Sequence, residues 1–262
     1  MIAIVGGGIS GLALAHQLSA RGRPFVLLEA AARVGGVIRS GRVDGHLLEW
    51  GPQRARLTHD FAVLVDELGL RDQIITSPPG LPLFVFVRGK LRRVPFSPGA
   101  FLRSDILTPR GKARLLLEPF TAPARDEESV ADFFTRKLGR EAYENLAGPL
   151  YGGLYASDPR EMVLGLSLRH VLREFNIGRS MLLPLLRRGG TIAPPAACSF
   201  RDGLETLPRA LHARHASHIH VATPVRTISR SGSSYIVATD DDRIDAEHVV
   251  LTTPAAASAR LL

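Results

Sequence analysis

A short apolar run, Ile2–Val5, opens the chain and predicts a buried β-strand. A glycine turn follows at Gly6–Gly8, and the segment Ile9–Ala20 has the apolar spacing of a helix that Gly22 closes. A second apolar run, Phe25–Leu28, predicts a second strand. The pattern therefore predicts a strand–turn–helix–strand unit of an α/β fold, with both strands in a parallel sheet.

Two pairs of short strand-like segments flank a two-residue turn, which is the pattern of a β-hairpin. The first pair is Gly41–Val43 and His46–Trp50, joined by Asp-Gly. The second pair is Leu83–Val87 and Lys90–Val94, joined by Arg-Gly. A Pro-rich loop begins at Thr76, so we expect the second hairpin to lie outside the α/β domain.

Helix signals occur twice more. Thr58 is placed to cap a helix that Gly69 ends, and Ser129-x-x-Asp132 has the form of a capping box before an apolar helical face. Towards the end of the chain, four segments alternate as strands do: His218–Ala222, Val225–Arg230, Tyr235–Thr239 and His248–Thr253, with turns at Gly232 and Asp240–Asp242.

The composition, 45% hydrophobic and 22% charged over 262 residues, is that of a folded globular protein. The single Cys198 excludes an internal disulfide. We expect no metal site, because the histidines between His212 and His220 straddle a predicted helix end and a strand start. Neither a P-loop nor a Ser/His/Asp arrangement occurs in a convincing context, so we expect no catalytic side chain, and the chemistry has to come from a cofactor.

The formal charge is +8, from 33 Lys+Arg against 25 Asp+Glu, and it points to an anionic partner. Cations are dense between Arg88 and Arg125, where they alternate with apolar and aromatic side chains. Two interpretations stay open for this region: an interfacial surface on a membrane, or a solvated helical face. No apolar run has the length of a bilayer-spanning helix, and no basic leader precedes the first strand. We expect a cytoplasmic protein, with peripheral contact to the cytoplasmic membrane left open, and no nucleic-acid partner.

The first turn carries Gly6-x-Gly8-x-x-Gly11, and the second strand ends in Glu29. This order is that of a dinucleotide-binding unit, in which the glycines admit a pyrophosphate at the amino end of the helix and the carboxylate binds a ribose. The cofactor contacts expected here are Gly6, Gly7, Gly8, Ile9, Ser10, Gly11, Glu29 and Ala30.

Beyond Glu29, the run Arg33-x-Gly35-Gly36 and the later Gly51-Pro52 resemble the signature of the amine-oxidase, phytoene-desaturase and protoporphyrinogen-oxidase group of flavoproteins. The resemblance implies FAD as the cofactor, with the Arg and the double Gly along the pyrophosphate, the Gly-Pro beside the flavin and a valine backbone near the adenine. The additional contacts implied are Arg33, Gly36, Val37, Gly51, Pro52, Gln53, Arg54 and Val225.

The stretch Glu128–Glu161 is similar to protoporphyrinogen oxidases, in which a Gly-rich turn lies against the substrate. The resemblance implies that Gly152, Gly153 and Leu154 line a substrate pocket. One departure is Leu83, because family members commonly carry Arg or Lys there as a partner for a propionate. Arg88 and Arg92 are the candidates to replace that partner.

The segment from Phe200 to Leu211 also resembles the family, in which Gly-Gly-Leu opens a helix, although Asp202 replaces the first glycine. After it, the family returns to the FAD domain, and the resemblance implies that the strand at His248–Thr253 rejoins the parallel sheet. We therefore expect a Rossmann-like FAD-binding domain at 1–76 and 200–262, with an inserted, mainly helical substrate- and membrane-binding region at 77–199.

The resemblance covers the first half of the family's domain plan, so we expect the carboxy-terminal part to be missing and this chain to be inactive alone. It implies that FAD accepts hydride from a porphyrinogen in heme biosynthesis until six electrons have left, and that oxygen reoxidises the flavin. Three alternatives stay open: coproporphyrinogen rather than protoporphyrinogen as the substrate, an amine or carotenoid-type oxidase of the same group, and a non-catalytic nucleotide-binding fragment. A homodimeric state also stays open.

Overall fold

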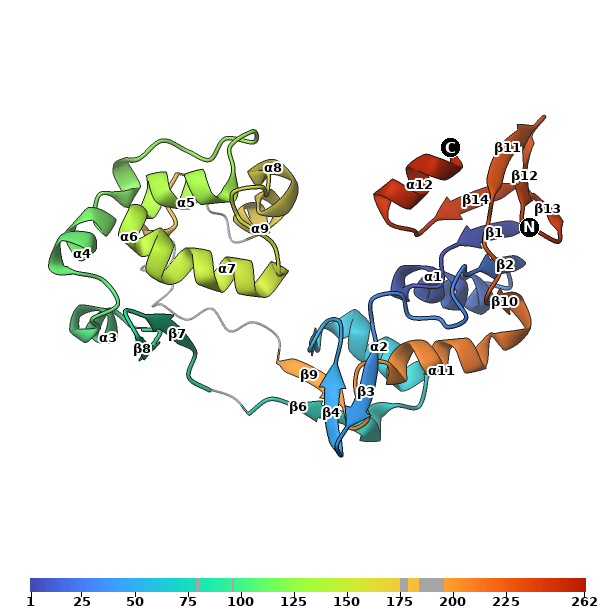
Figure 1. Ribbon diagram of the computed structural model, residues 1–262, viewed down its shortest axis with the longest axis horizontal. Helices are drawn as coiled ribbons and strands as arrows, with labels where there is room; N and C mark the ends of the chain where they lie inside the picture. Colours follow the sequence, from blue (N-terminus) through green and yellow to red (C-terminus); the bar gives the residue numbers. More distant parts are fainter. Residues whose placement is uncertain (79–80, 96, 175–178, 184–195) are drawn as a thin grey trace. The chain divides into compact units, whose positions relative to one another are not determined.

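The computed structural model describes residues 1–78, 81–95, 97–174, 179–183 and 196–262 (Figure 1). The chain divides into two compact units, one made of Met1–Pro79 with Pro195–Leu262 and the other of Gly80–Pro194. The expected boundary at residue 200 is wrong by a few residues, because the strand Ala197–Phe200 pairs with strands of the first unit. The functions expected for the two units stay predictions.

A parallel sheet forms the centre of the first unit. In the described residues its order is β10 (Ile219–His220), β2 (Phe25–Leu28), β1 (Ile2–Val5) and β14 (His248–Leu251). Ile2 lies opposite Phe25 on one side and His248 on the other. The α/β class and the return of the last strand to this sheet are confirmed.

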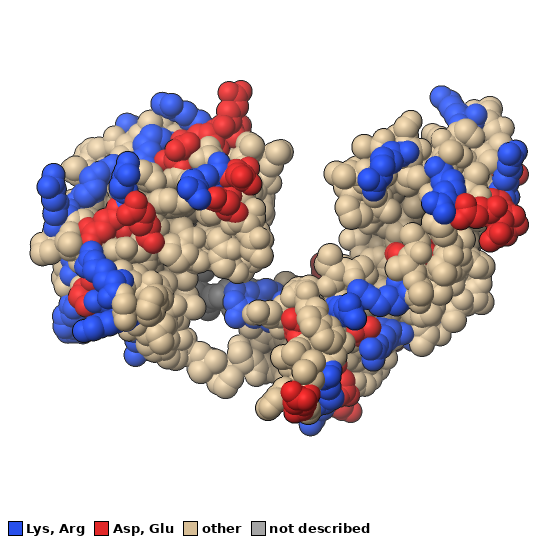
Figure 2. Space-filling model, in the orientation of Figure 1, with Lys and Arg blue, Asp and Glu red and all other residues tan. Residues whose placement is uncertain are grey.

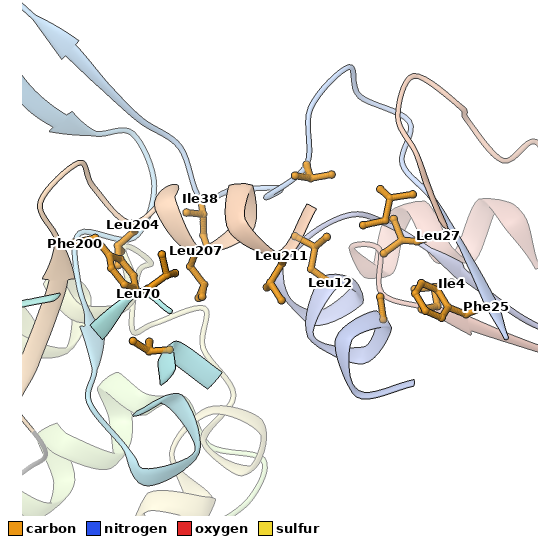
Figure 3. Packing of buried hydrophobic residues seen from close by; sticks show 14 residues of the cluster. Ile4, Leu12, Phe25, Leu27, Ile38, Leu70, Phe200, Leu204, Leu207 and Leu211 are labelled. Atoms are coloured by element: carbon orange, nitrogen blue, oxygen red, sulfur yellow. The ribbon is translucent and has the colours of Figure 1, made fainter. Parts of the chain in front are cut away.

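Helices α1 (Ile9–Ala20) and α11 (Thr206–Arg214) cover one face of this sheet. Side chains alternate across a strand, so Ile4 and Leu27 point to this face and pack with Leu12 of α1 and Leu211 of α11 (Figure 3). The same apolar cluster includes Val65, Leu70 and Phe200, so a single core joins the central sheet to the segments that contain these residues.

The opposite face carries a second sheet of antiparallel strands, β11 (Thr227–Ser231), β12 (Ser234–Ala238) and β13 (Arg243–Ala246). Val237 and Ala246 are buried against the other set of side chains of the central strands, including Ala3 and Val26. The sequence predicted the first two strands and missed β13. Its alternation, Arg-Ile-Asp-Ala, includes two charged residues, and the strand is identified by its pairing with β12.

Shorter elements complete the first unit. The hairpin predicted around Asp44-Gly45 is present as β3 and β4, whereas β5, β6 and β9 form a sheet that the sequence did not predict. Thr58 caps α2 as predicted, because its hydroxyl accepts a hydrogen bond from the N–H of Phe61. The bounds are β3 (Ser40–Val43), β4 (His46–Glu49), β5 (Ala55–Arg56), α2 (His59–Glu67), η1 (Arg71–Gln73), β6 (Ile74–Thr76), β9 (Ala197–Phe200), η4 (Ala216–His218) and α12 (Ala255–Leu261).

Two buried histidines join the helices of the first unit. His16 Nδ1 lies 3.0 Å from His215 Nε2, and His16 Nε2 lies 2.9 Å from Glu67 Oε2. Burial, reinforced by His16, Arg214 and His218, lowers the pKa of His215 below its ordinary value. Protonation therefore favours the unfolded chain, in which a histidine has a pKa of about 6.5.

Stability should consequently fall as the pH drops below about 6.5 and level off below the lowered pKa of folded His215. The change His215→Gln removes this titrating group, so the dependence of the unfolding free energy on pH should become shallower between about pH 7 and 5.5. Urea denaturation at a series of pH values measures it. The carboxylates of Glu118 and Glu205, whose pKa values are lowered, titrate below this range. If the unfolding free energy depends equally on pH in the unchanged chain and in His215→Gln, the expectation is contradicted.

The second unit combines the predicted second hairpin with helices. The capping box is present at α5, where Ser129 Oγ accepts from the Asp132 N–H at 3.0 Å. Phe133 and Phe134 of α5 are buried with Tyr151 of α7. The bounds are β7 (Phe84–Val87), β8 (Lys90–Arg93), α3 (Pro98–Arg103), α4 (Pro109–Leu115), η2 (Glu118–Phe120), α5 (Val130–Leu138), α6 (Arg140–Ala142), η3 (Tyr143–Ala147), α7 (Gly148–Tyr155), α8 (Leu164–Ser167) and α9 (Arg169–Glu174).

The glycine pair of the second unit does not form a turn, which corrects the expectation for this segment. Gly152 and Gly153 lie inside α7, and the helix ends at Ala156, whose φ of 50° is left-handed. The helix continues through the glycines because Tyr151, between Leu150 and Gly152, is anchored in the apolar cluster of α5 and α8.

None of the helices in the described ranges is long and apolar enough to cross a bilayer. Among the same residues, no group of three or more His, Cys, Asp or Glu side chains could hold a metal ion.

Candidate functional site

The glycine turn of the first unit leaves the amino end of α1 uncovered by side chains. Gly8 precedes the helix in an extended conformation, and Ile9, Ser10 and Gly11 form the first turn. A Cβ on Gly11 would lie 2.1 Å from the Gly6 carbonyl oxygen and 2.8 Å from Thr252 Oγ1, so this position accepts only glycine. The first N–H groups of a helix lack carbonyl partners and carry its positive end, which favours a phosphate there.

Glu29 lies directly beside this turn, as the sequence predicted. Its Oε2 accepts a hydrogen bond from the Gly7 N–H at 2.5 Å, and its Oε1 accepts from the Ala31 N–H at 2.8 Å. These bonds fix the carboxylate at the end of β2. Each carboxylate oxygen has a further lone pair, so ribose hydroxyls can still donate to it.

The second glycine pair packs against the first turn. The Gly35 N–H donates to the Gly7 carbonyl at 2.7 Å, and Gly8 pairs with Gly35 in a parallel bridge. Arg33 donates to the carbonyls of the loop itself, Val34 and Ile38 at 3.1 Å and Gly36 at 2.8 Å. The structure thus brings together two motifs that are more than 20 residues apart, and Arg33 holds the loop; its contact with a pyrophosphate stays a prediction.

The segment after β4 returns to the same loop. A Cβ on Gly51 would lie 1.9 Å from the Val37 carbonyl oxygen, so the two backbones touch there. The Val37 side chain is 78% exposed, and Pro52, Gln53 and Arg54 are exposed as well. These residues form an accessible edge next to the glycine turns, where the resemblance places the flavin.

A buried polar network behind the hairpin was not predicted. Ser40 Oγ donates to Glu49 Oε2 at 2.6 Å and accepts from the Glu205 N–H at 3.0 Å, while the Ser40 N–H donates to Glu205 Oε2 at 2.9 Å. Burial opposes the charge of Glu205, but the Ser40 N–H and Arg209 outweigh it and lower the pKa of that carboxyl. This network ties β3 and β4 to the start of α11. Asp202 stays at the surface, paired with Arg42 at 3.1 Å.

A cavity of about 320 Å³ opens at the carboxyl ends of β1 and β2. We call it the sheet-edge pocket. Open α/β sheets bind their ligands at this edge. Four predicted residues line it together, Gly6, Glu29, Ala30 and Val225. The remaining lining residues are Val5, Leu28, Arg226, Thr253, Ala257, Arg260 and Leu261.

The α12 side of this pocket was not predicted from the sequence. A usable signal existed, because the end of a predicted parallel strand, here Thr253, and the residues after it lie at the same sheet edge as the glycine turn. The lining supplies a fixed carboxylate for a ribose and an apolar side wall that includes Val225. The glycine turn that begins at Gly6 leads from this pocket to the uncovered amino end of α1, which suits a pyrophosphate.

The two arginines suggested as propionate partners in the second unit already hold carboxylates. Arg88 pairs with Glu141 at 2.6 Å, and Arg92 Nε lies 2.9 Å from Asp105. An open basic pocket of about 730 Å³ adjoins Arg92. Its lining includes three cations that form no ion pair within the described residues, Lys90, Arg93 and Arg103. Cations for an acidic ligand are therefore available here.

The predicted substrate residues occupy the last turns of α7. Leu154 is 63% exposed, and the Cβ direction of Gly153 meets no atom within 4 Å. Gly152 lies close to the Ser157 carbonyl and Pro159. The structure brings these three residues together on one helix, and their contact with a substrate stays a prediction.

The fold and the sheet-edge pocket have the features of a dinucleotide-binding unit, and comparison with known proteins identifies the family. The family model of flavin-containing amine oxidoreductases matches residues 9–262, so the chain belongs to that family. The family's cofactor is a flavin, which agrees with the prediction of FAD over NAD.

Similar proteins with curated names act on porphyrinogens. The chloroplastic protoporphyrinogen oxidase of Oryza sativa subsp. japonica is 33% identical over 99% of this chain and 53% of its own length. The coproporphyrinogen III oxidase of Bacillus subtilis (strain 168) is 29% identical over 100% of this chain and 61% of its own. The crystal structure of a protein assigned as a protoporphyrinogen oxidase, from Exiguobacterium sp. 255-15, superposes with a TM-score of 0.77 at 25% identity, over 100% of this chain and 61% of that one. The chain thus spans about half the length of the curated relatives it matches.

Proposed function

We propose that the first unit binds FAD across the sheet-edge pocket and the glycine turns. The observation that carries this proposal is the meeting of Gly6, Glu29 and Val225 in one pocket at the carboxyl edge of the sheet. The amino end of α1 would hold the pyrophosphate, Glu29 the adenosine ribose, and the exposed edge at Val37 and Gly51 would face the flavin. When bound, the flavin supplies the hydride acceptor and the site of reoxidation by oxygen.

We propose further that the protein carrying this chain oxidises a porphyrinogen to a porphyrin. The sequence identity of 33% with a protoporphyrinogen oxidase, over 99% of this chain, supports a porphyrinogen over an amine as the substrate. The second unit would hold the macrocycle through Leu154 and the neighbouring glycines of α7, and the unpaired cations of the basic pocket suit its propionates. The role of these residues is to position the macrocycle and to exclude water, not to act as acid or base.

The test is the natural protein incubated with anaerobically prepared protoporphyrinogen and then exposed to air. We expect red porphyrin fluorescence to rise faster than with FAD alone. A sample stripped of flavin serves as the control. A rate equal to that of FAD alone would overturn the proposal, and peroxide production from putrescine without porphyrin formation would favour an amine oxidase instead.

Coproporphyrinogen is the second candidate substrate, favoured by the similarity to the Bacillus subtilis enzyme and by the cations of the basic pocket. Coproporphyrinogen has four propionates and protoporphyrinogen two. A site with three unpaired cations therefore matches the negative charge of coproporphyrinogen better than that of protoporphyrinogen. Competition between the two porphyrinogens for the natural protein, followed by the ratio of their kcat/KM values, distinguishes them. A carotenoid-type desaturase would oxidise neither.

We also propose a peripheral membrane contact through the second unit. Phe86 and Leu91 lie opposite each other on β7 and β8, and both are 70% exposed, as is Leu102 of α3 at 71%. Lys90, Arg93 and Arg103 accompany them, so a lipid contact is the alternative to a role of these three cations in binding propionates. Together these six residues are the basic–apolar surface; Figure 2 shows Lys and Arg gathered in this part of the second unit. Apolar side chains ringed by cations suit an anionic lipid surface.

Vesicles of phosphatidylglycerol and phosphatidylcholine should therefore co-sediment with the chain at low salt and release it as salt rises. The double change Phe86→Ser and Leu91→Ser should weaken this binding about tenfold or more, because two apolar side chains no longer enter the lipid. The matched control is Val63→Ser, an exposed apolar residue of α2 in the first unit. Binding that is independent of salt, lipid charge and the double change would leave this surface a solvated face.

A further inference from the structure

The sheet-edge pocket has a wall to which the sequence patterns assigned no role. It consists of Thr253 after β14 and of Ala257, Arg260 and Leu261 on α12. We propose that Arg260 recognises the adenine base of the bound dinucleotide by stacking its guanidinium on the ring. The inference rests on the proposed binding of FAD and adds a residue that sets its specificity.

The charge of Arg260 is available for a ligand. Two arginines line the sheet-edge pocket. Arg226 is held by Asp240 in a bidentate pair, with both nitrogen–oxygen distances at 2.7 Å. Arg260 forms no ion pair with any residue that the structure describes, and it is exposed at the rim of the pocket.

The pocket leaves one orientation for the adenosine. Glu29 fixes the ribose at the end of β2, and the pyrophosphate belongs at the amino end of α1. The base then extends into the remaining volume, between the side that includes Ala30 and Val225 and the wall of α12. Its size, about 320 Å³, is at the lower end for small-molecule sites and suits a flat ring rather than a whole dinucleotide.

Stacking requires the planar group of arginine. A guanidinium is flat, delocalised and weakly hydrated, so it stacks on aromatic rings, whereas a lysine ammonium is a compact, strongly hydrated charge. Ala257 lies one helical turn before Arg260, on the same pocket wall. Its small side chain leaves room for the ring beneath the arginine.

The test compares the affinity of the chain for FAD, ADP, FMN and inorganic pyrophosphate by calorimetry, in the unchanged chain and in Arg260→Ala, Arg260→Lys and Ala257→Leu. The control variant is Arg243→Ala, an exposed arginine of β13 that does not line the pocket. We expect FAD and ADP to bind about 5- to 30-fold more weakly in both Arg260 variants, because lysine keeps the charge but cannot stack. Ala257→Leu should weaken both ligands by filling the pocket. FMN and pyrophosphate, which lack adenine, should be unaffected.

Three results would overturn the inference. The first is undiminished ADP binding by Arg260→Ala or Ala257→Leu. The second is full recovery of ADP binding by Arg260→Lys with a parallel loss of pyrophosphate in Arg260→Ala, which would assign the arginine to the phosphates. The third is an unchanged chain that binds neither ADP nor FAD, and this result alone would also overturn the proposed function.

Discussion

The change Glu29→Ala is expected to weaken FAD binding by about tenfold to a hundredfold. The change removes the hydrogen bonds that the ribose would donate to the carboxylate, and hydrogen bonds to a charged group contribute about 1.5–3 kcal/mol each. It would also release the N–H groups of Gly7 and Ala31 that position the glycine turn. Quenching of flavin fluorescence during titration of the chain measures the affinity.

Two comparisons separate the ribose contact from a general loss of structure. Glu29→Gln keeps one acceptor oxygen and should fall between the unchanged chain and Glu29→Ala. FMN has no adenosine ribose, so its binding should weaken much less than that of FAD in either variant. Equal weakening of FMN and FAD would mean that Glu29 supports the fold of the loop and not the cofactor.

The change Lys137→Met is expected to destabilise the second unit by about 3–5 kcal/mol. Lys137 is 1% exposed, and its Nζ lies 2.9 Å from an oxygen of Glu118, which is fully buried. Removal of the cation leaves a buried carboxylate without its counter-charge. Urea denaturation, followed by the fluorescence of the tyrosines of this unit, measures the unfolding free energy.

The environment of Glu118 explains the size of this effect. Burial opposes its charge, but hydrogen bonds from Ser180, Met181 and Lys137 outweigh burial and lower its pKa. A lowered pKa stabilises the fold above the pKa of about 4.3 of an unfolded glutamate, and that contribution disappears as the pH falls through the folded value.

The double change Glu118→Gln and Lys137→Met should recover most of the stability, because it removes the charge together with its partner. Lys90→Met, which replaces an exposed lysine of β8, is the matched control and should change the stability little. If the unfolding free energy of Lys137→Met equals that of Lys90→Met, the buried pair of Glu118 and Lys137 does not contribute to the stability of this unit.

The sequence could predict those parts of the fold that depend on local patterns. The apolar runs of β1 and β2, the glycine turn and Glu29 lie next to one another along the chain, and their arrangement follows from the geometry of a single strand–helix–strand unit. The hairpin turns and the caps at Thr58 and Ser129 are also local signals, and the structure contains them.

Features that depend on distant partners could not be predicted in this way. The strand β9 pairs with β5 and β6 across more than a hundred residues. The network of Ser40, Glu49 and Glu205 joins side chains from the two separate chain segments that make up the first unit. Glycines signal a turn when tertiary packing is ignored. In α7 the burial of Tyr151 beside Gly152 overrides that preference.

The central claim is that this chain is the dinucleotide-binding part of a flavoprotein, and a direct binding measurement tests it. The chain would be titrated into FAD and, separately, into NAD, with flavin fluorescence and calorimetry as the respective readouts. The sheet-edge pocket and the glycine turns predict saturable binding of FAD, competed by ADP, and much weaker binding of NAD. Preferential binding of NAD, or no interaction with FAD, would contradict the account.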